Sequence, residues 1–154
     1  FFVYGLTILG NDIKASGVNE PLFRLGTMGV FFGTLGIVFA ISLGNMLNLD
    51  DLTGLPEGYE GTMQIIGGGF QTYTSVLFSI GITFVALAVA SNREGTHRIF
   101  GYFVALLGTV NIAVTTINLL DSSTWESTFI LTPISYLIFS IWSITIGLNL
   151  LKKK

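Results

Sequence analysis

The polar residues best placed to do chemistry within the apolar part of this 154-residue chain are Asn111, Thr115 and Asn118. Their spacings of four and three place them on one face of a helix. A buried amide without a partner is costly in hydrocarbon, so this face should look into a bundle or cavity. We favour hydrogen bonds between helices as their role, and a small-solute channel or transporter is the alternative. The full stripe comprises Gly101, Ala105, Gly108, Asn111, Thr115 and Asn118.

Groups suited to metal binding or catalysis are sparse. Four carboxylates offer the oxygen ligands that calcium prefers; they are Asp50, Asp51, Glu57 and Glu60. Their spacing does not match an EF-hand loop, so we favour a solvated acidic surface. His97 is the only histidine, and there is no cysteine. The chain alone therefore cannot build a bis-histidine haem or zinc-thiolate site. It also lacks the common nucleophile, phosphate-loop and zinc-hydrolase motifs. We expect no catalytic activity in this chain alone, no metal site and no cofactor, and we assign no cofactor-binding residue.

The elements that would position these residues are four long apolar stretches, at 22–47, 73–91, 99–120 and 129–151. Each is close to or above the roughly 20 residues that a helix needs to cross a hydrocarbon core of about 30 Å. Lipid requires every backbone polar group to be paired internally, and these runs do not alternate as barrel strands do. The sequence therefore predicts an all-α, polytopic transmembrane bundle that forms one membrane domain over residues 1–154.

Two of the segments outside the four spans carry further predictions. Residues 1–10 are apolar but cover only about 15 Å as a helix, so we expect either part of a further span or an interfacial or re-entrant segment. Residues 48–72 combine Pro56 with Gly54, Gly58 and Gly61, which is typical of turns. We expect an outer loop there that lies on the helix ends.

Charge is distributed unevenly between the two sets of connecting segments. The segments that four crossings place on one side carry all seven basic residues, namely Lys14, Arg24, Arg93, Arg98, Lys152, Lys153 and Lys154. The opposite segments carry acidic residues and no Lys or Arg. The positive-inside rule then predicts a cytoplasmic carboxyl terminus, and we expect the cell membrane as the location. A net charge of −2 without a basic run interleaved with aromatics gives no support for nucleic-acid binding.

Small residues in the first full span recur at intervals of three and four along one face; they are Gly26, Gly29, Gly33, Gly36, Ala40 and Gly44. Lipid offers no hydrophobic drive for helix association, so close backbone approach through small residues is the usual packing device. Gly29-xxx-Gly33 and Ala40-xxx-Gly44 match the small-xxx-small pattern. We predict a packing face whose partner is either another helix of this chain or another protein.

The spans carry faces suited to helix packing and no ionisable residue in their central parts. This combination favours a non-catalytic membrane subunit that stabilises a larger membrane complex. Its expected partners are the lipid bilayer and either other integral membrane subunits or further copies of itself. Two alternatives stay open. One is the channel or transporter lined by Asn111, Thr115 and Asn118. The other is a subunit of a membrane enzyme complex that binds a quinone, lipid or other cofactor between its helices.

Overall fold

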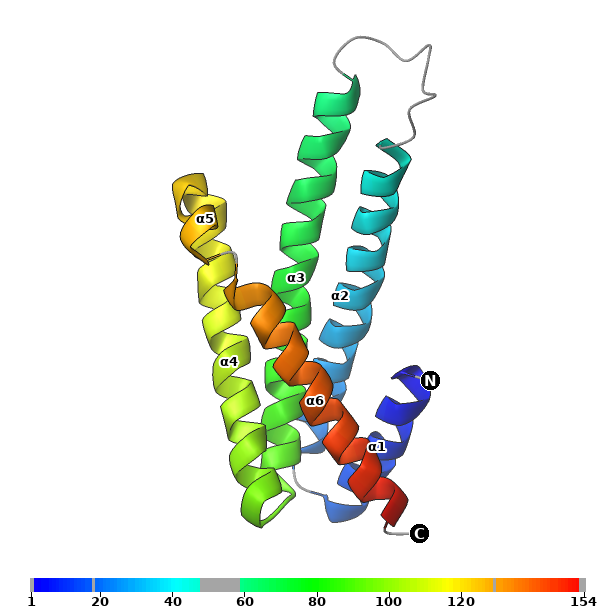
Figure 1. Ribbon diagram of the computed structural model, residues 1–154. Helices are drawn as coiled ribbons and strands as arrows, with labels where there is room; N and C mark the ends of the chain where they lie inside the picture. Colours follow the sequence, from blue (N-terminus) through cyan, green and yellow to red (C-terminus); the bar gives the residue numbers. More distant parts are fainter. Residues whose placement is uncertain (1, 18, 48–58, 129, 153–154) are drawn as a thin grey trace.

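The computed structural model describes residues 2–17, 19–47, 59–128 and 130–152, and every regular element in that part of the chain is a helix (Figure 1). The elements are α1 (Phe2–Ser16), α2 (Glu20–Leu47), α3 (Tyr59–Ser91), α4 (Gly95–Leu120), the 3-10 helix η1 (Ser122–Thr124), α5 (Trp125–Thr128) and α6 (Leu131–Lys152). The predicted all-α bundle is confirmed. Four helices contain a stretch long and apolar enough to span a membrane, at Glu20–Leu43, Ile65–Ser91, Gly95–Leu120 and Leu131–Leu150.

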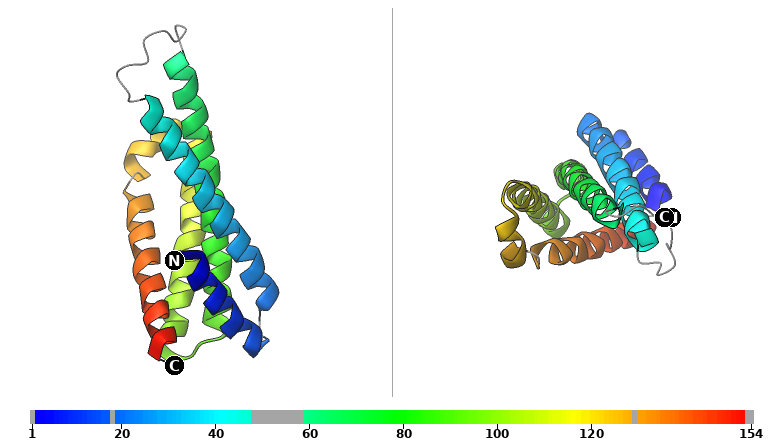
Figure 2. Two further views of the ribbon diagram at one scale, coloured as in Figure 1. Left: turned by 90° about the vertical axis from the view of Figure 1, so that its right-hand side faces the viewer. Right: turned by 90° about the horizontal axis from the view of Figure 1, so that it is seen from above.

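The helix α3 lies at the centre of the bundle, between α2 and α4, with α6 crossing one face and α1 beside α2 (Figure 2). Its half nearest Ser91 is the most enclosed part of the chain, since Val85, Ala86 and Val89 are almost completely buried. One apolar core joins α1, α2, α3, α4 and α6. The end of the bundle that carries Lys14, Arg24, Arg93 and Arg98 is called the basic end below.

Large apolar side chains also cover the outside of the bundle. Met28 and Phe32 on α2, Leu106 on α4, and Leu137 on α6 are all well exposed. In water such a surface would drive aggregation, whereas hydrocarbon solvates it at no cost. Together with the four long apolar helices, this surface fits a multi-pass membrane protein in contact with lipid.

The prediction of an outer loop over 48–72 is wrong for its second part, because α3 begins at Tyr59. Residues 48–58 lie outside the described part of the chain. The glycines at 61 and 67–69 resemble turn residues, yet apolar neighbours continue the helix, and Phe70 packs edge-on against Phe39 of α2 with ring centroids 5.4 Å apart. A neighbouring helix thus supports a segment whose glycines favour helix only weakly.

The first helix is longer than the apolar segment 1–10 indicates, because α1 continues through the polar residues to Ser16. It ends where Gly17 adopts a left-handed conformation, with φ at 69°, and donates its amide hydrogen to the carbonyl oxygens of Ile13 and Lys14 at 3.2 Å each. This is a common glycine-based helix end. Asn19, just before α2, also has a positive φ, and α1 lies beside the first part of α2 (Figure 2).

Candidate functional site

The small-residue stripe of α2 faces α3 of the same chain. A Cβ placed on Gly26 would lie 2.7 Å from the amide nitrogen of Val85, and one on Gly29 would lie 2.9 Å from the Cα of Gly81. At Gly33 the corresponding distance to the Cα of Phe78 is 2.6 Å. These are backbone atoms, so the two helices touch main chain to main chain, and no larger residue fits without separating them.

The stripe continues toward the far end of α2. A Cβ on Gly36 would overlap the side chain of Thr74, and Ala40 is buried. Gly44 belongs to α2, but its surroundings lie outside the described residues. The described stripe members therefore take part in an intramolecular seam, which we call the α2–α3 seam and define by Gly26, Gly29, Gly33 and Gly36 with Gly81 opposite.

A second seam joins α3 to α4. A Cβ on Gly101 would lie 2.9 Å from the Cβ of Ala90, and one on Gly108 would overlap the hydroxyl of Thr83. One turn further along, the side-chain amide of Asn111 donates to Ser79 Oγ at 2.7 Å, and both residues are fully buried. The Asn111 carbonyl oxygen has no hydrogen-bond partner among the described residues. Thr115, the next polar member of the stripe, is buried on the same helix.

Asn118 has different neighbours from Asn111. Its amide donates to Thr128 Oγ1 at 2.8 Å, and its carbonyl oxygen accepts from Thr124 Oγ1 at 2.6 Å. These partners belong to η1 and α5, so Asn118 fastens the end of α4 to the connection that follows it. The two asparagines of the predicted polar stripe therefore have different contacts. Asn111 binds α3 across the second seam, and Asn118 binds η1 and α5 next to it in the chain.

The last helix packs through aromatic side chains instead of glycines. Phe78 of α3 contacts Tyr136 and Phe139 of α6, with ring centroids 5.4 and 6.4 Å apart. Trp142 of α6 is 3% exposed. Trp142 belongs to the apolar core together with Phe139, so bulky aromatic side chains hold α6 on the bundle.

Beyond the seam, α3 has an uncovered face formed by Ile65, Gly68, Gly69, Thr72 and Tyr73, which we call the distal α3 face. These positions follow the i, i+3, i+4, i+7, i+8 pattern of one helix side. Ile65 and Tyr73 are 78% and 75% exposed. A Cβ added at Gly68 or Gly69 would meet nothing within 4 Å. This face carries the same small residues as the seams, but no described residue covers it.

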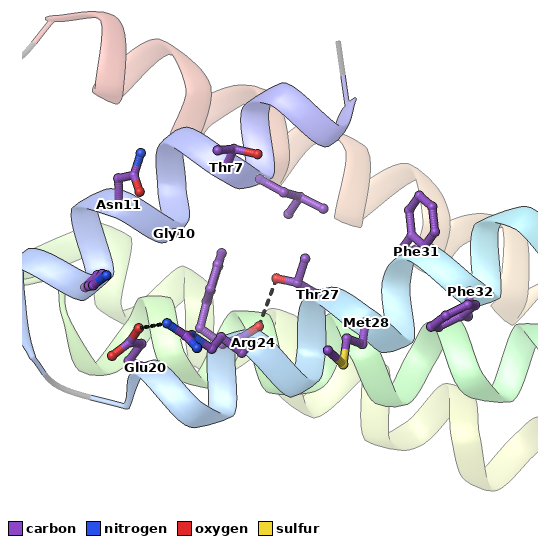
Figure 3. Close-up of a pocket in the computed structure, with 12 residues that line it drawn as sticks. Thr7, Gly10, Asn11, Glu20, Arg24, Thr27, Met28, Phe31 and Phe32 are labelled. Carbon is purple, nitrogen blue, oxygen red and sulfur yellow. Dashed lines mark hydrogen bonds and ion pairs between the residues drawn. The ribbon is translucent and has the colours of Figure 1, made fainter.

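A groove of about 450 Å³ lies between α1 and α2 near the basic end (Figure 3). Its lining comprises Leu6, Thr7, Gly10, Asn11, Lys14, Glu20, Phe23, Arg24, Thr27, Met28, Phe31 and Phe32. Glu20 and Arg24 pair at 2.7 Å at one end of the groove, and Phe31 and Phe32 lie at the other (Figure 3). The sequence-based expectations did not include this groove, because they placed Lys14 and Arg24 in segments that connect spans. The available signal was that Lys14 and Arg24 lie on either side of Gly17, a residue type that often ends a helix.

Polar contacts also tie α1 to the connection between α3 and α4. Arg93 forms an ion pair with Asp12, and Ser16 hydrogen-bonds to Asn92. The Arg93 side chain is only 12% exposed, so the pair is better shielded from water than an ordinary surface ion pair. This contact holds one wall of the groove in place relative to α3.

Metal and acid-base chemistry find little support in the described residues. No group of three or more His, Asp or Glu side chains in that part of the chain is arranged to hold a metal ion, and His97 is half-buried in the first turn of α4. Asp50, Asp51 and Glu57 lie outside the described residues, as does the side chain of Glu60. The Ser123 hydroxyl and amide donate to Asp121 and hold the pKa of this exposed carboxyl below its usual range.

Comparison with family models, curated proteins and solved structures finds no match to this chain. Function must therefore be inferred from the seams, the distal α3 face and the groove.

Proposed function

We propose that this chain is a non-catalytic integral membrane subunit that packs within a larger membrane complex and stabilises it. The distal α3 face carries the proposal, because it presents two open glycines between the exposed side chains of Ile65 and Tyr73. In lipid, helices associate where small residues allow close approach, and Gly68-xxx-Thr72 offers such a position. The occupant that fits this face is an apolar helix of another membrane subunit.

The two seams within the bundle support this assignment by analogy. Where α2 meets α3, and where α3 meets α4, glycine on one helix accepts the backbone or small side chains of the next. The distal α3 face has the same composition and lies on the same helix as Gly81. A partner helix there would extend a packing mode that the chain already uses twice.

We also propose that the basic end faces the cytoplasm of a cell membrane. Arg24 and Arg93 lie near the ends of spans on this side, and basic residues close to span ends favour the cytoplasmic face. The helix α6 also ends on this side of the bundle, at Lys152 (Figure 1). Labelling single cysteines placed at Lys14 and at Ile130 with a membrane-impermeant maleimide tests this orientation, since only Ile130 should react from outside intact cells.

Site-directed photocrosslinking tests the subunit proposal with little background, because the chain has no cysteine. Single cysteines at Ile65 and Tyr73 would carry a benzophenone in native membranes. We expect crosslinks to a discrete polypeptide from both positions. Matched controls at Leu106 and Leu137, which are 61% and 62% exposed on α4 and α6, should give only lipid adducts.

A second variant separates docking from folding. A Cβ at Gly68 would meet nothing within 4 Å, so in Gly68→Leu the fold should persist while the polypeptide crosslink from Tyr73 falls at least tenfold. Equal crosslinking from all four positions, or a crosslink unaffected by Gly68→Leu, would remove the basis of the proposal.

The channel alternative receives less support from the geometry. The side-chain amides of Asn111 and Asn118 donate to Ser79 and Thr128, and these bonds support a packing role more than a shared solute path. Solute flux in liposomes that disappeared in the Asn111→Leu variant, with the bundle still folded, would favour this alternative over the subunit proposal.

A further inference from the structure

We infer that the groove between α1 and α2 binds one anionic phospholipid from the membrane leaflet at the basic end. This inference is independent of the partner subunit proposed above and requires only that the bundle spans a membrane. It rests on three properties of the groove: the charge at its mouth, its apolar interior and its length.

The mouth of the groove matches the charge of a single phosphodiester. Lys14 and Arg24 supply two positive charges and Glu20 one negative charge, which leaves a net charge of +1. The Arg24 side chain is 67% exposed while it pairs with Glu20, so other guanidinium N–H groups stay available to a phosphate. Basic pockets between membrane helices are established binding sites for anionic headgroups.

The interior of the groove suits a hydrocarbon tail. Leu6, Phe23, Met28, Phe31 and Phe32 supply its apolar lining. Gly10 allows α1 to approach the Phe23 ring, because a Cβ there would lie 3.0 Å from that ring. The Thr27 hydroxyl is satisfied by the Phe23 carbonyl oxygen at 2.9 Å, so it leaves no unpaired hydroxyl beside a tail.

The length of the groove fits one leaflet. From Arg24 to Phe32 the helix rises about 12 Å at 1.5 Å per residue. Half of a hydrocarbon core is about 15 Å. With the two cations at headgroup level, the aromatic end therefore lies near the depth that a lipid tail reaches. The charged and aromatic ends of the groove are separated in this way in Figure 3.

Native mass spectrometry of the full chain, released from detergent with added dioleoyl phosphatidylglycerol, tests the inference. We expect one retained lipid per chain, with affinity about fivefold weaker in Lys14→Gln and in Arg24→Gln, the effect of one basic residue near an anionic headgroup. Glu20→Gln should bind more tightly, since the net charge of the mouth rises. Phosphatidylcholine should bind more weakly than phosphatidylglycerol to the unaltered chain.

Arg98→Gln is the matched charge control, because it removes one positive charge at the same end but outside the groove. Thr27→Trp fills the groove and keeps its charges, so it should abolish the one-lipid state, with circular dichroism confirming the fold. Met28→Trp provides a second filling variant at an exposed position if Thr27→Trp unfolds.

Three outcomes would overturn the inference. Equal losses in Lys14→Gln and Arg98→Gln would show only a diffuse surface potential. Unchanged lipid retention in a folded filling variant would place the lipid elsewhere. Displacement of phosphatidylglycerol by millimolar inorganic phosphate would indicate an anion site without a role for the tail.

Discussion

The helix α3 contains two glycine-bearing regions with opposite surroundings. In the proximal segment, residues 74–91, Gly81 touches the backbone of α2, and a Cβ there would lie 2.7 Å from the carbonyl oxygen of Gly26. In the distal segment, residues 61–73, the glycines at 67, 68 and 69 have nothing within 4 Å of the corresponding position. The same residue type on the same helix therefore serves a completed seam in one region and an open face in the other.

This difference shows that glycine content alone does not identify an interface. What distinguishes the regions is enclosure: Ser79 and Val85 in the proximal segment are almost completely buried, whereas Ile65 and Tyr73 in the distal segment are not. If the distal segment is a seam that awaits a partner, substitutions there should spare the isolated chain. Substitutions in the proximal segment should destabilise it.

The largest contrast is expected between Gly81→Ala and Gly68→Ala, which add the same methyl group. Gly81→Ala drives that group into the α2 backbone and should lower the free energy of unfolding by about 2 to 3 kcal/mol. Gly68→Ala should be neutral or stabilising by up to about 1 kcal/mol, because alanine favours helix more than glycine does. Unfolding of the detergent-solubilised chain by sodium dodecyl sulfate measures both. Similar losses in the two variants would contradict the comparison.

An intermediate difference in stability loss is expected between truncations of two phenylalanines, one in each segment of α3. Phe78 packs against Tyr136 and Phe139, whereas Phe70 is 41% exposed and has Phe39 as its ring neighbour. Lipid is as apolar as the core, so truncation mainly costs the contacts around the resulting cavity. Phe78→Ala should lower the free energy of unfolding by about 2 kcal/mol and loosen the packing of α6. Phe70→Ala should lower it by less than about 1 kcal/mol. Hydrogen exchange of α6 amides should rise only in the first variant.

A smaller contrast concerns two hydroxyl groups. Ser79→Ala removes the acceptor of the buried Asn111 amide and should cost about 0.6 to 1.7 kcal/mol, between the average and the largest value found for hydrogen bonds between membrane helices. Thr72→Ala removes a bond to the Gly68 carbonyl of its own helix and should be nearly neutral. A double-mutant cycle with Asn111→Ala isolates the Ser79 contact. A coupling energy near zero would show that this buried pair adds nothing to the seam.

The sequence was sufficient to predict helices, four spans and the glycine stripe of α2, because hydrophobic length and residue spacing are local properties. Which helix covers Gly26, Gly29 and Gly33 depends on tertiary pairing, which the spacing of residues within one helix does not determine. Spacing therefore left open whether the partner was internal. The structure shows these three glycines against α3.

Two features escaped prediction for separate reasons. The glycine run at 67–69 resembles a turn, and only the neighbouring helix explains why it is helical. The groove depends on α1 continuing to Ser16 and folding back at Gly17, so that Lys14 and Arg24 line one groove. No periodic pattern encodes that approach, since it depends on where the chain turns back between two helices.

The smallest effect should come from a polar contact far from the basic end, where Asp121 accepts hydrogen bonds from Ser123 at 2.7 and 3.0 Å. These bonds lower the pKa of Asp121 in the folded chain, so its contribution to stability is present above the unfolded pKa of about 3.9. That contribution is lost as the pH falls through the folded pKa. Stability of the wild-type chain should therefore fall between about pH 5 and pH 3 slightly more than that of Asp121→Asn.

Ser123→Ala removes the hydroxyl donor and keeps the carboxylate. Its loss of stability on acidification should therefore lie between those of the wild-type chain and Asp121→Asn. Unfolding by sodium dodecyl sulfate over this pH range provides the measurement. Because the carboxyl is fully exposed, solvent screens its interactions, and its effect should stay well below that of the buried Ser79 contact. A loss of stability with pH as large as the Ser79→Ala loss would mean that exposed polar contacts stabilise this bundle as much as enclosed ones. Enclosure would then not explain the difference between the proximal and distal segments of α3.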